Sequence, residues 1–518
     1  MGTLDGQEEA MQDRSRVIFG NEISEADYKA ACKSKANFVK RFGDDSTAVY
    51  HLAASDLPVI GERLGVHNLV MASGDTALDL AADAAGAPAH AATPRTVEGA
   101  SGSPIVVGNI RMGFGHYRIS MAMARAAHAM GYTPYWLDLC SFPETTCSKV
   151  IAYQNDLYSM GSRLSQTLPP FNALYWEPLN SEGFRKLTYN ASDQKNAELM
   201  VPIFRDLPKD VPYVGTHVWP AQAAVHAGLT HVVNAIPDNW PMALHLAEGS
   251  IHTVQTPSSY LGYKQLRGMD PKRALKPMPE GSIRYVGHYV DHELVSNIGV
   301  DCAARRERLL GGGPVRYLMT VGGAGAQAKL FSAIIKHLMP YVERGEATLM
   351  LNLGDHEKVW RDLCRSVKGL REMAVTHFGD FAETAAFAEA ALTGPVEGIH
   401  AFSDSDIFAA VYSTNLLMRS SDVLVTKPSE LSFYPVPKLM IHRVGGHEAW
   451  GAIRAAEVGD GTYEIDETPE VLAMIDSMQT DRGNVAQMCD RIEEADRLGI
   501  DDGAYEVIRL AVTGGFVH

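Results

Sequence analysis

The chain has neither an excess of positive charge nor a long apolar run. Its 518 residues include 46 Lys and Arg against 62 Asp and Glu, which gives a formal net charge of −16. Nucleic-acid backbones are bound by clustered Lys and Arg, so this balance argues against a general nucleic-acid-binding protein. No stretch approaches the ~18 consecutive apolar residues of a membrane span. The acidic first residues lack the apolar core of a signal peptide, so we expect a cytoplasmic protein.

The six cysteines lack the spacing of a metal site or a redox pair. No Cys-x-x-Cys occurs among them, and scattered thiols are typical of a reduced cytoplasmic protein. The sequence also lacks a Gly-x-Gly-x-x-Gly turn followed by an acidic residue about twenty positions later. This absence disfavours a dehydrogenase that binds a dinucleotide.

The length of the chain exceeds what one ordinary hydrophobic core can hold, so we expect several domains. The stretch 96–104 combines Gly, Ser and Pro and predicts a linker, and the glycines at 311–313 predict a break between two halves. Arg305, Arg306 and Arg308 predict a solvated helix just before that break. We therefore predict four segments, which are an accessory N-terminal region with its linker (1–103), an N-terminal domain (104–312), a C-terminal domain (313–480) and a helical tail (481–518).

Strand-like and helix-like segments alternate after Pro104. Strands are predicted at 67–71, 133–137, 231–236, 284–286, 348–353, 423–426 and 439–442. Leu330, Ile334 and Leu338 form one apolar stripe, which predicts a helix that ends at Pro340. This alternation predicts an α/β protein with parallel sheets, in which ligands bind beyond the carboxyl ends of the strands.

Two glycine-rich turns lie where a predicted strand meets a predicted helix. The first is Gly113-Phe114-Gly115-His116, and the second contains Gly322, Gly323 and Gly325. Glycine lets the backbone approach a ligand closely, and a following helix offers N–H groups and its positive dipole end to an anion. Two such turns in one chain predict a cleft enzyme that handles a phosphorylated ligand.

Four segments in this order resemble the GT-B glycosyltransferases. They are the first glycine turn, Thr216-His217 together with Ile236-Pro237-Asp238, the second glycine turn, and residues 421–451. The resemblance is to the family of monogalactosyldiacylglycerol synthases, processive diacylglycerol glucosyltransferases and the peptidoglycan N-acetylglucosaminyltransferase, and it spans residues 104 to about 480. It implies a GT-B fold, in which two Rossmann-like domains face each other across a cleft, with residues 1–103 as an accessory subdomain.

The same resemblance implies an enzyme that moves a sugar from a nucleotide sugar, with a UDP-sugar expected, to a hydroxyl group. Transfer would be metal-independent and inverting, with the nucleotide sugar as co-substrate and no further cofactor. The expected acceptor is a lipid or a small molecule, and the acidity of the chain leaves only weak peripheral membrane contact. Two alternatives stay open, which are an epimerase or phosphorylase on the same fold and a non-catalytic nucleotide-sugar-binding protein.

The residues expected to act on the acceptor lie in the N-terminal half. His116 stands at a predicted helix start, where the dipole lowers the pKa of an imidazole and favours the neutral form that a base requires. Asp238 is the rival proton acceptor. By the resemblance, Gly113, Gly115 and His217 line the acceptor side.

The residues expected to hold the donor lie in the C-terminal half. The resemblance assigns the diphosphate to Lys427 and the second glycine turn, the ribose to Glu430 and the base to Phe402. Ala324 removes a hydroxyl that relatives carry, and Ser429 and Glu430 stand where they carry glycines. The full set of donor residues is Gly322, Gly323, Gly325, Gln327, Phe402, Lys427, Ser429, Glu430, Gly446, His447 and Glu448.

Overall fold

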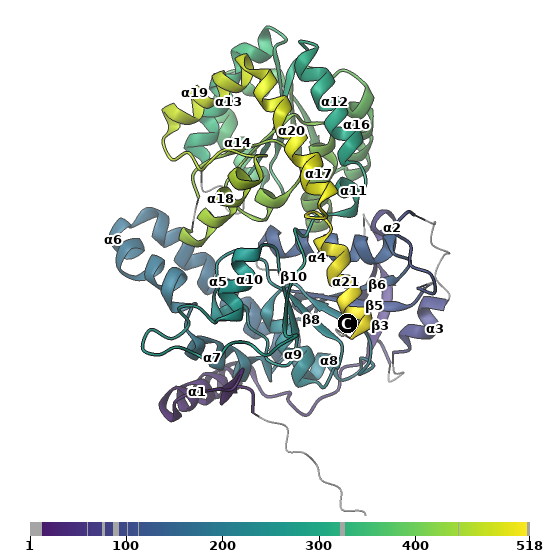
Figure 1. The fold of residues 1–518 in the computed structure, drawn as a ribbon, viewed down its shortest axis with the longest axis vertical. Helices are drawn as coiled ribbons and strands as arrows, with labels where there is room; N and C mark the ends of the chain where they lie inside the picture. Colours follow the sequence, from purple (N-terminus) through teal and green to yellow (C-terminus); the bar gives the residue numbers. More distant parts are fainter. Residues whose placement is uncertain are drawn as a thin grey trace, which may run out of the picture.

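The scaffold of the protein consists of two parallel β-sheets, one in each half of the chain (Figure 1). The computed structural model describes residues 13–514 except 58, 60, 75–77, 86–92, 101, 112, 322–326 and 444. Within this described part, no helix is long and apolar enough to cross a membrane.

The N-terminal sheet has eight strands in the order β10-β9-β8-β7-β5-β6-β4-β3. All neighbouring strands run parallel except the pair β3 and β4. The strands are β3 (Leu52–Asp56), β4 (His67–Met71), β5 (Pro104–Asn109), β6 (Thr133–Asp138), β7 (Tyr213–Gly215), β8 (Val232–Ala235), β9 (Ile251–Val254) and β10 (Ile283–Tyr285). A separate hairpin joins β1 (Val17–Ile18) to β2 (Asn21–Glu22).

Helices and helical turns connect these strands. They are α1 (Glu25–Phe42), α2 (Gly61–Leu64), α3 (Leu80–Ala85), α4 (Phe114–Ala129), η1 (Leu139–Ser141), α5 (Thr146–Thr167), α6 (Pro169–Phe171), η2 (Asn172–Trp176), η3 (Leu179–Gly183), α7 (Leu187–Ala197), α8 (Val201–Phe204), α9 (Val218–His226), η4 (Ala243–His245) and α10 (Pro257–Lys264).

The C-terminal sheet has six strands in the order β13-β14-β12-β11-β15-β16, and all of them run parallel. The strands are β11 (Val315–Thr320), β12 (Ala347–Asn352), β13 (Ala374–Phe378), β14 (Ile399–Ser403), β15 (Val423–Thr426) and β16 (Lys438–Met440). The helical segments are α11 (His292–Val295), α12 (Ile298–Leu310), α13 (Ala328–Glu343), α14 (Glu357–Ser366), α15 (Leu370–Met373), α16 (Phe381–Thr393), α17 (Ile407–Ser420), η6 (Glu430–Phe433), η7 (Gly446–Glu448), α18 (Ala449–Val458) and α19 (Thr468–Thr480). Two parallel sheets with helical crossovers confirm the predicted fold class, a pair of Rossmann-like domains.

Two parts of the predicted division belong to a different sheet or half from the one that the sequence indicated. Strands β3 and β4, from the predicted accessory region, extend the N-terminal sheet through the pairing of β4 with β6. Helix α12, assigned by prediction to the N-terminal half, bonds to the C-terminal half, where buried Arg305 donates to the carbonyl oxygens of Met418 and Ser421 at 2.8 Å. The prediction that Arg305 is solvated is therefore wrong. The four-segment division stays a prediction.

The predicted helical tail is two helices that cross from one half to the other. Helix α20 (Arg482–Arg497) packs on α12 of the C-terminal half, and α21 (Gly503–Thr513) packs on α4 and β8 of the N-terminal half (Figure 1). Residues 286–291 also cross between the halves, because they connect β10 to α11. This segment lies against the link between α20 and α21, since His288 N–H donates to Ile500 O at 2.6 Å. The two crossings thus lie side by side.

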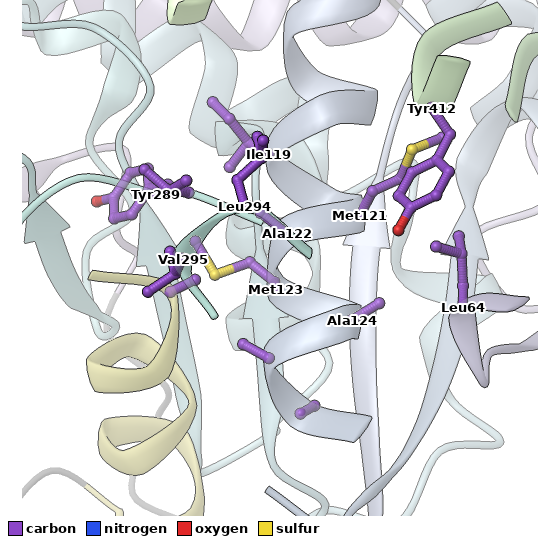
Figure 2. Close-up of a cluster of buried hydrophobic side chains, with 14 of the residues drawn as sticks. Leu64, Ile119, Met121, Ala122, Met123, Ala124, Tyr289, Leu294, Val295 and Tyr412 are labelled. Atoms are coloured by element: carbon purple, nitrogen blue, oxygen red, sulfur yellow. The ribbon is translucent and has the colours of Figure 1, made fainter. Parts of the chain in front are cut away.

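Helix α4 packs against α21 of one crossing and also joins the two halves directly, through α17. Its residues from Tyr117 to Ala127 are buried except Arg125, and an all-round apolar helix of this kind belongs in a core. Figure 2 shows Met121 of α4 beside Tyr412 of α17, with Leu64 of α2 nearby, while Met123 faces Val295 of α11. One hydrophobic cluster therefore spans both halves.

Most of the predicted strands are present within one or two residues of their predicted ends. Those at 67–71 and 423–426 match β4 and β15. The predicted stop at Pro340 is wrong, because α13 continues to Glu343 and Arg344 N–H donates to Pro340 O. Proline lacks only its own N–H, so one in the last turn removes a single bond.

The buried His252 predicts a loss of stability in acid. Its Nδ1–H donates to Ser282 O at 3.0 Å and its Nε2 accepts from Ala247 N–H at 2.9 Å, so the folded protein holds the neutral ring. Burial lowers its pKa from 6.5 to about 4. The unfolded chain takes up the proton first as pH falls below 6.5, so we expect about 3 kcal/mol of folding stability to disappear between pH 6.5 and 4.

Urea unfolding at several pH values measures this loss. The variant His252→Gln should be less stable at pH 7 and should show a shallower decline toward pH 4. His67→Gln, which changes a partly exposed ring with no ion pair among the described residues, is the control and should keep the wild-type slope. Equal slopes for His252→Gln and wild type would contradict the assignment.

Candidate functional site

A pocket lies between the two halves and has a volume of about 270 Å³. Its N-terminal wall follows the carboxyl ends of β5, β7 and β8, as expected for parallel sheets. Its C-terminal wall follows β15 and includes the turn η6 and the start of α18. The residues that line it are Gly115, His116, Ile119, Tyr158, Asn180, Phe184, His217, Pro237, Asp238, Asn239, Met242, Leu244, His245, Lys427, Ser429, Glu430, Phe433, Glu448 and Gly451.

His116 lies in the first turn of α4, after Gly113 with its positive φ of 103°. Its Nδ1 lies 2.9 Å from Thr216 O. A carbonyl oxygen only accepts, so Nδ1 carries the proton and a neutral His116 keeps its lone pair on Nε2. The pKa of His116 is lowered, as predicted, but burial is the largest cause. The ring therefore offers a hydrogen-bond acceptor to the pocket.

His217 has the opposite tautomer. It caps α9, and its Nδ1 accepts from Trp219 N–H at 3.2 Å. Burial lowers its pKa well below the usual value, so the ring is neutral and carries its proton on Nε2. The rings of His116 and His217 meet edge to face at 4.8 Å. The two side chains thus give the pocket an acceptor beside a donor.

Asp238 follows β8 and is paired with a histidine that the sequence analysis did not single out. Its Oδ2 lies 2.9 Å from Nε2 of His245, which is buried in the turn η4. Asn234 Nδ2 donates to His245 O at 2.7 Å and fixes that turn to the sheet. The carboxylate and the imidazole both line the pocket.

The C-terminal wall contributes two ion pairs. Lys427 Nζ donates to Glu448, whose other carboxylate oxygen accepts from Gly445 N–H at 3.1 Å. Glu430 Oε1 accepts from Arg118 Nε at 3.2 Å, and Arg118 is a buried residue of α4. Arg118 also donates to Val411 O, Thr414 Oγ1 and Asn415 Oδ1 of α17, so it links the two halves behind the pocket.

Three more predicted residues have structural partners. Ser429 lines the pocket and caps η6, where its hydroxyl accepts from Leu431 N–H at 3.4 Å. Gln327 and Gly446 are not among the lining residues, and Gln327 donates to His442 O. A Cβ atom on Gly446 would lie 2.3 Å from Oε1 of Glu177 in the N-terminal half, so a larger residue there would displace the end of that side chain.

Phe402 is not brought to the pocket. Its buried ring stacks on His377 with centroids 4.7 Å apart, and its carbonyl accepts from Leu353 N–H. Gly322, Gly323 and Gly325 lie outside the described residues, as does the side chain of His447. Their predicted donor contacts stay predictions.

The aromatic segment between β6 and β7 supplies lining residues that sequence reasoning did not assign. Tyr158 of α5, Asn180 of η3 and Phe184 all reach the pocket. At the mouth, Trp240 stacks on Trp450 with centroids 5.0 Å apart, which joins the two halves again. The aromatic content of the segment was visible in the sequence, but its position against the C-terminal half was not.

One group of described residues has the geometry to hold a metal ion, and it lies outside the pocket. His442, Glu464 and Asp466 place possible ligand atoms within 4.8 Å of one another. Glu464 also pairs with Arg443, and His442 and Asp466 are exposed. A neighbouring guanidinium group weakens the attraction of such a group for a cation.

Removal of Arg118 tests the link between the two halves. Arg118→Met leaves Glu430 without its cation and removes one donor from each of three acceptors of α17, so we expect a loss of about 3 kcal/mol in the free energy of unfolding. Urea denaturation measures it. Arg361→Met is the control, because Arg361 forms an exposed pair with Glu357 and should change stability by less than about 0.5 kcal/mol. Equal stability of both variants would contradict the assigned role.

Comparisons with known proteins find matches to two family models and to distant solved structures. Residues 17–265 match DUF6937 and residues 278–512 match DUF6938, each described as a domain of unknown function. The sequence matches no curated protein. A UDP-GlcNAc 2-epimerase from Neisseria meningitidis, bound to UDP-GlcNAc, is 10% identical, with a TM-score of 0.41 over 79% of this chain and 100% of the other. An α,α-trehalose 6-phosphate synthase from Burkholderia multivorans is 12% identical, with a TM-score of 0.40 over 79% of this chain and 98% of the other.

Proposed function

We propose that the protein transfers a sugar from a nucleotide-sugar donor to a hydroxyl acceptor, and that the pocket between its two halves is the reaction site. The observation that carries the proposal is the meeting of two predicted sets of residues in one cavity. His116, His217 and Asp238 line one wall, and Lys427, Glu430 and Glu448 line the other. The two sets are far apart in the sequence. The first was predicted to act on the acceptor, and the second was predicted to hold the donor.

The donor would bind against the C-terminal wall. Lys427 is the lining residue with a fixed positive charge, and an ammonium group is a common partner of phosphate in proteins. In the ligand-free protein it is paired with Glu448. A bound diphosphate would replace Glu448 at Lys427, and Glu448 would then accept hydrogen bonds from sugar hydroxyls. This exchange keeps both charges partnered in the bound state.

The acceptor would bind against the N-terminal wall, where neutral imidazoles can take a proton from a hydroxyl group. A nucleoside diphosphate leaves as a stable anion, so one proton acceptor is enough for the reaction. The attacking oxygen would form its bond to the anomeric carbon while the bond to the diphosphate breaks. Direct displacement of this kind inverts the configuration at that carbon.

A panel of nucleotide sugars tests the donor class. UDP-, GDP-, ADP- and dTDP-sugars are each added to the protein, and the melting temperature is recorded. We expect one nucleotide to raise it, because a ligand that binds only the folded state stabilises that state. Product analysis with lipid and soluble hydroxyl acceptors should then show an inverted glycoside. If no nucleotide shifts the melting temperature, the proposed donor class is wrong.

Lys427→Met should weaken donor binding. Loss of one charge-assisted hydrogen bond costs about 1.5–3 kcal/mol, so we expect roughly a 10- to 100-fold rise in the dissociation constant by calorimetry. Lys358→Met is the matched control, since Lys358 is an exposed lysine paired with Asp362 in the same half. Unchanged affinity of the Lys427 variant would place the diphosphate elsewhere.

The same experiments separate the alternatives. Conversion of the sugar nucleotide without any acceptor would identify an epimerase, and dependence on inorganic phosphate would identify a phosphorylase. Binding without turnover, unchanged in His116→Ala, would identify a non-catalytic binding protein.

A further inference from the structure

His245 is the third imidazole of the pocket wall, beside His116 and His217. It belongs to the turn η4, between the buried residues Ala243 and Leu246. Asn190 Nδ2 donates to the carbonyl oxygens of both neighbours, at 2.8 and 2.7 Å. Asn234 fixes the carbonyl of His245 itself. The backbone under this side chain is therefore anchored to α7 and β8.

The contact with Asp238 determines which nitrogen of His245 carries the proton. Nε2 lies 2.9 Å from the carboxylate oxygen Oδ2, and a carboxylate accepts, so Nε2 donates. No described residue bonds to Nδ1, and His245 lines the cavity. A neutral His245 therefore presents a lone pair on Nδ1 to a molecule bound there. A carboxylate behind one ring nitrogen and a lone pair on the other is the arrangement of a general base.

The charge that develops during proton transfer favours His245 over His116. When His245 accepts a proton, the resulting imidazolium faces the Asp238 carboxylate. When His116 accepts one, the imidazolium faces Thr216 O and the ring of His217, and burial opposes its charge. An ion pair stabilises the conjugate acid more than a neutral carbonyl does.

We propose that His245 is the catalytic base of the transfer reaction and that Asp238 is the positioning residue that orients and stabilises it. This inference rests on the function proposed above. The acceptor O–H proton moves to Nδ1 of His245, the acceptor oxygen bonds to the anomeric carbon, and the bond from that carbon to the diphosphate breaks with its electron pair on the leaving nucleotide. His116 Nε2 accepts a hydrogen bond from the substrate and His217 Nε2 donates one.

Several charged or titratable groups surround His245. Asp238 adjoins it directly, and His116 and His217 lie within electrostatic range. Tyr158 of α5 also lines the cavity, and Lys427, Glu430 and Glu448 contribute charges from the opposite wall. Of these, the carboxylate of Asp238 bonds to the ring and therefore favours the imidazolium most directly.

The experiment measures turnover and the position of the proton on His245. His245→Gln should lower kcat by about 10²- to 10⁴-fold, as for loss of a general base, with unchanged affinity for the nucleotide. His116→Gln should mainly raise KM for the acceptor. Asp238→Asn should lower kcat and leave KM for the acceptor unchanged, because the imidazolium loses its charged partner while the binding residues stay in place.

Nitrogen-15 NMR of histidine-labelled protein follows the ring without any substrate. We expect His245 to carry its proton on Nε2 and its ring signals to shift in Asp238→Asn, where a neutral amide replaces the carboxylate that accepts from Nε2. Asp476→Asn is the matched control, because Asp476 holds His337 through the same kind of contact, Nε2 to Oδ1 at 2.6 Å, away from the pocket. It should leave the His245 signal unchanged.

The outcomes distinguish this inference from the function on which it rests. If no nucleotide sugar binds or reacts, the proposed function is wrong, whatever the NMR shows. If turnover occurs and folded His245→Gln keeps kcat within about threefold of wild type, the proposed base is wrong and the function stands. A His245 proton on Nδ1, or ring signals of His245 unaffected by Asp238→Asn, would also overturn the proposed pair.

Discussion

The arrangement of the site depends on the buried guanidinium group of Arg118. This side chain leaves α4 in the N-terminal half and donates to three acceptors of α17 and to Glu430, all in the C-terminal half. A buried charge is tolerated only with such partners, so it fixes how the two halves meet. The same helix begins at the pocket with His116 and buries Met121 against Tyr412 of α17 (Figure 2). One helix therefore positions the acceptor wall and holds the donor wall opposite it.

The charged groups of the pocket occur in three pairs, and a ligand has to displace one partner of a pair to bind its charge. Lys427 is paired with Glu448, Glu430 with Arg118, and Asp238 with His245. The first pair is partly exposed and lies in the segments that follow β15 and β16, so a diphosphate can compete for the ammonium group. The second is fixed by a buried residue and serves the scaffold. The third joins a carboxylate to an imidazole, which suits it to proton transfer rather than to binding of an anion.

Patterns along the chain predicted the parts of the structure that follow from local physics. Alternating strands and helices gave the parallel sheets, and the strands at 67–71 and 423–426 have the predicted bounds. Long-range pairing decided the rest. Arg305 looked like one of several solvated arginines, yet it is buried because carbonyls at the end of α17 need a donor. Phe402 was predicted to contact the base, but it lies on β14 with its ring stacked on His377. His245 carries no signal of its own, because only the fold brings it to Asp238.

The most direct test of the account is a crystal structure of the protein with a bound nucleotide sugar. The account predicts the sugar in the pocket between the halves, with the diphosphate on Lys427 and the anomeric carbon facing His245 and His116. It also predicts that Glu448 leaves Lys427 and contacts the sugar. A nucleotide sugar that binds outside this pocket, with the pair of Lys427 and Glu448 intact, would contradict it.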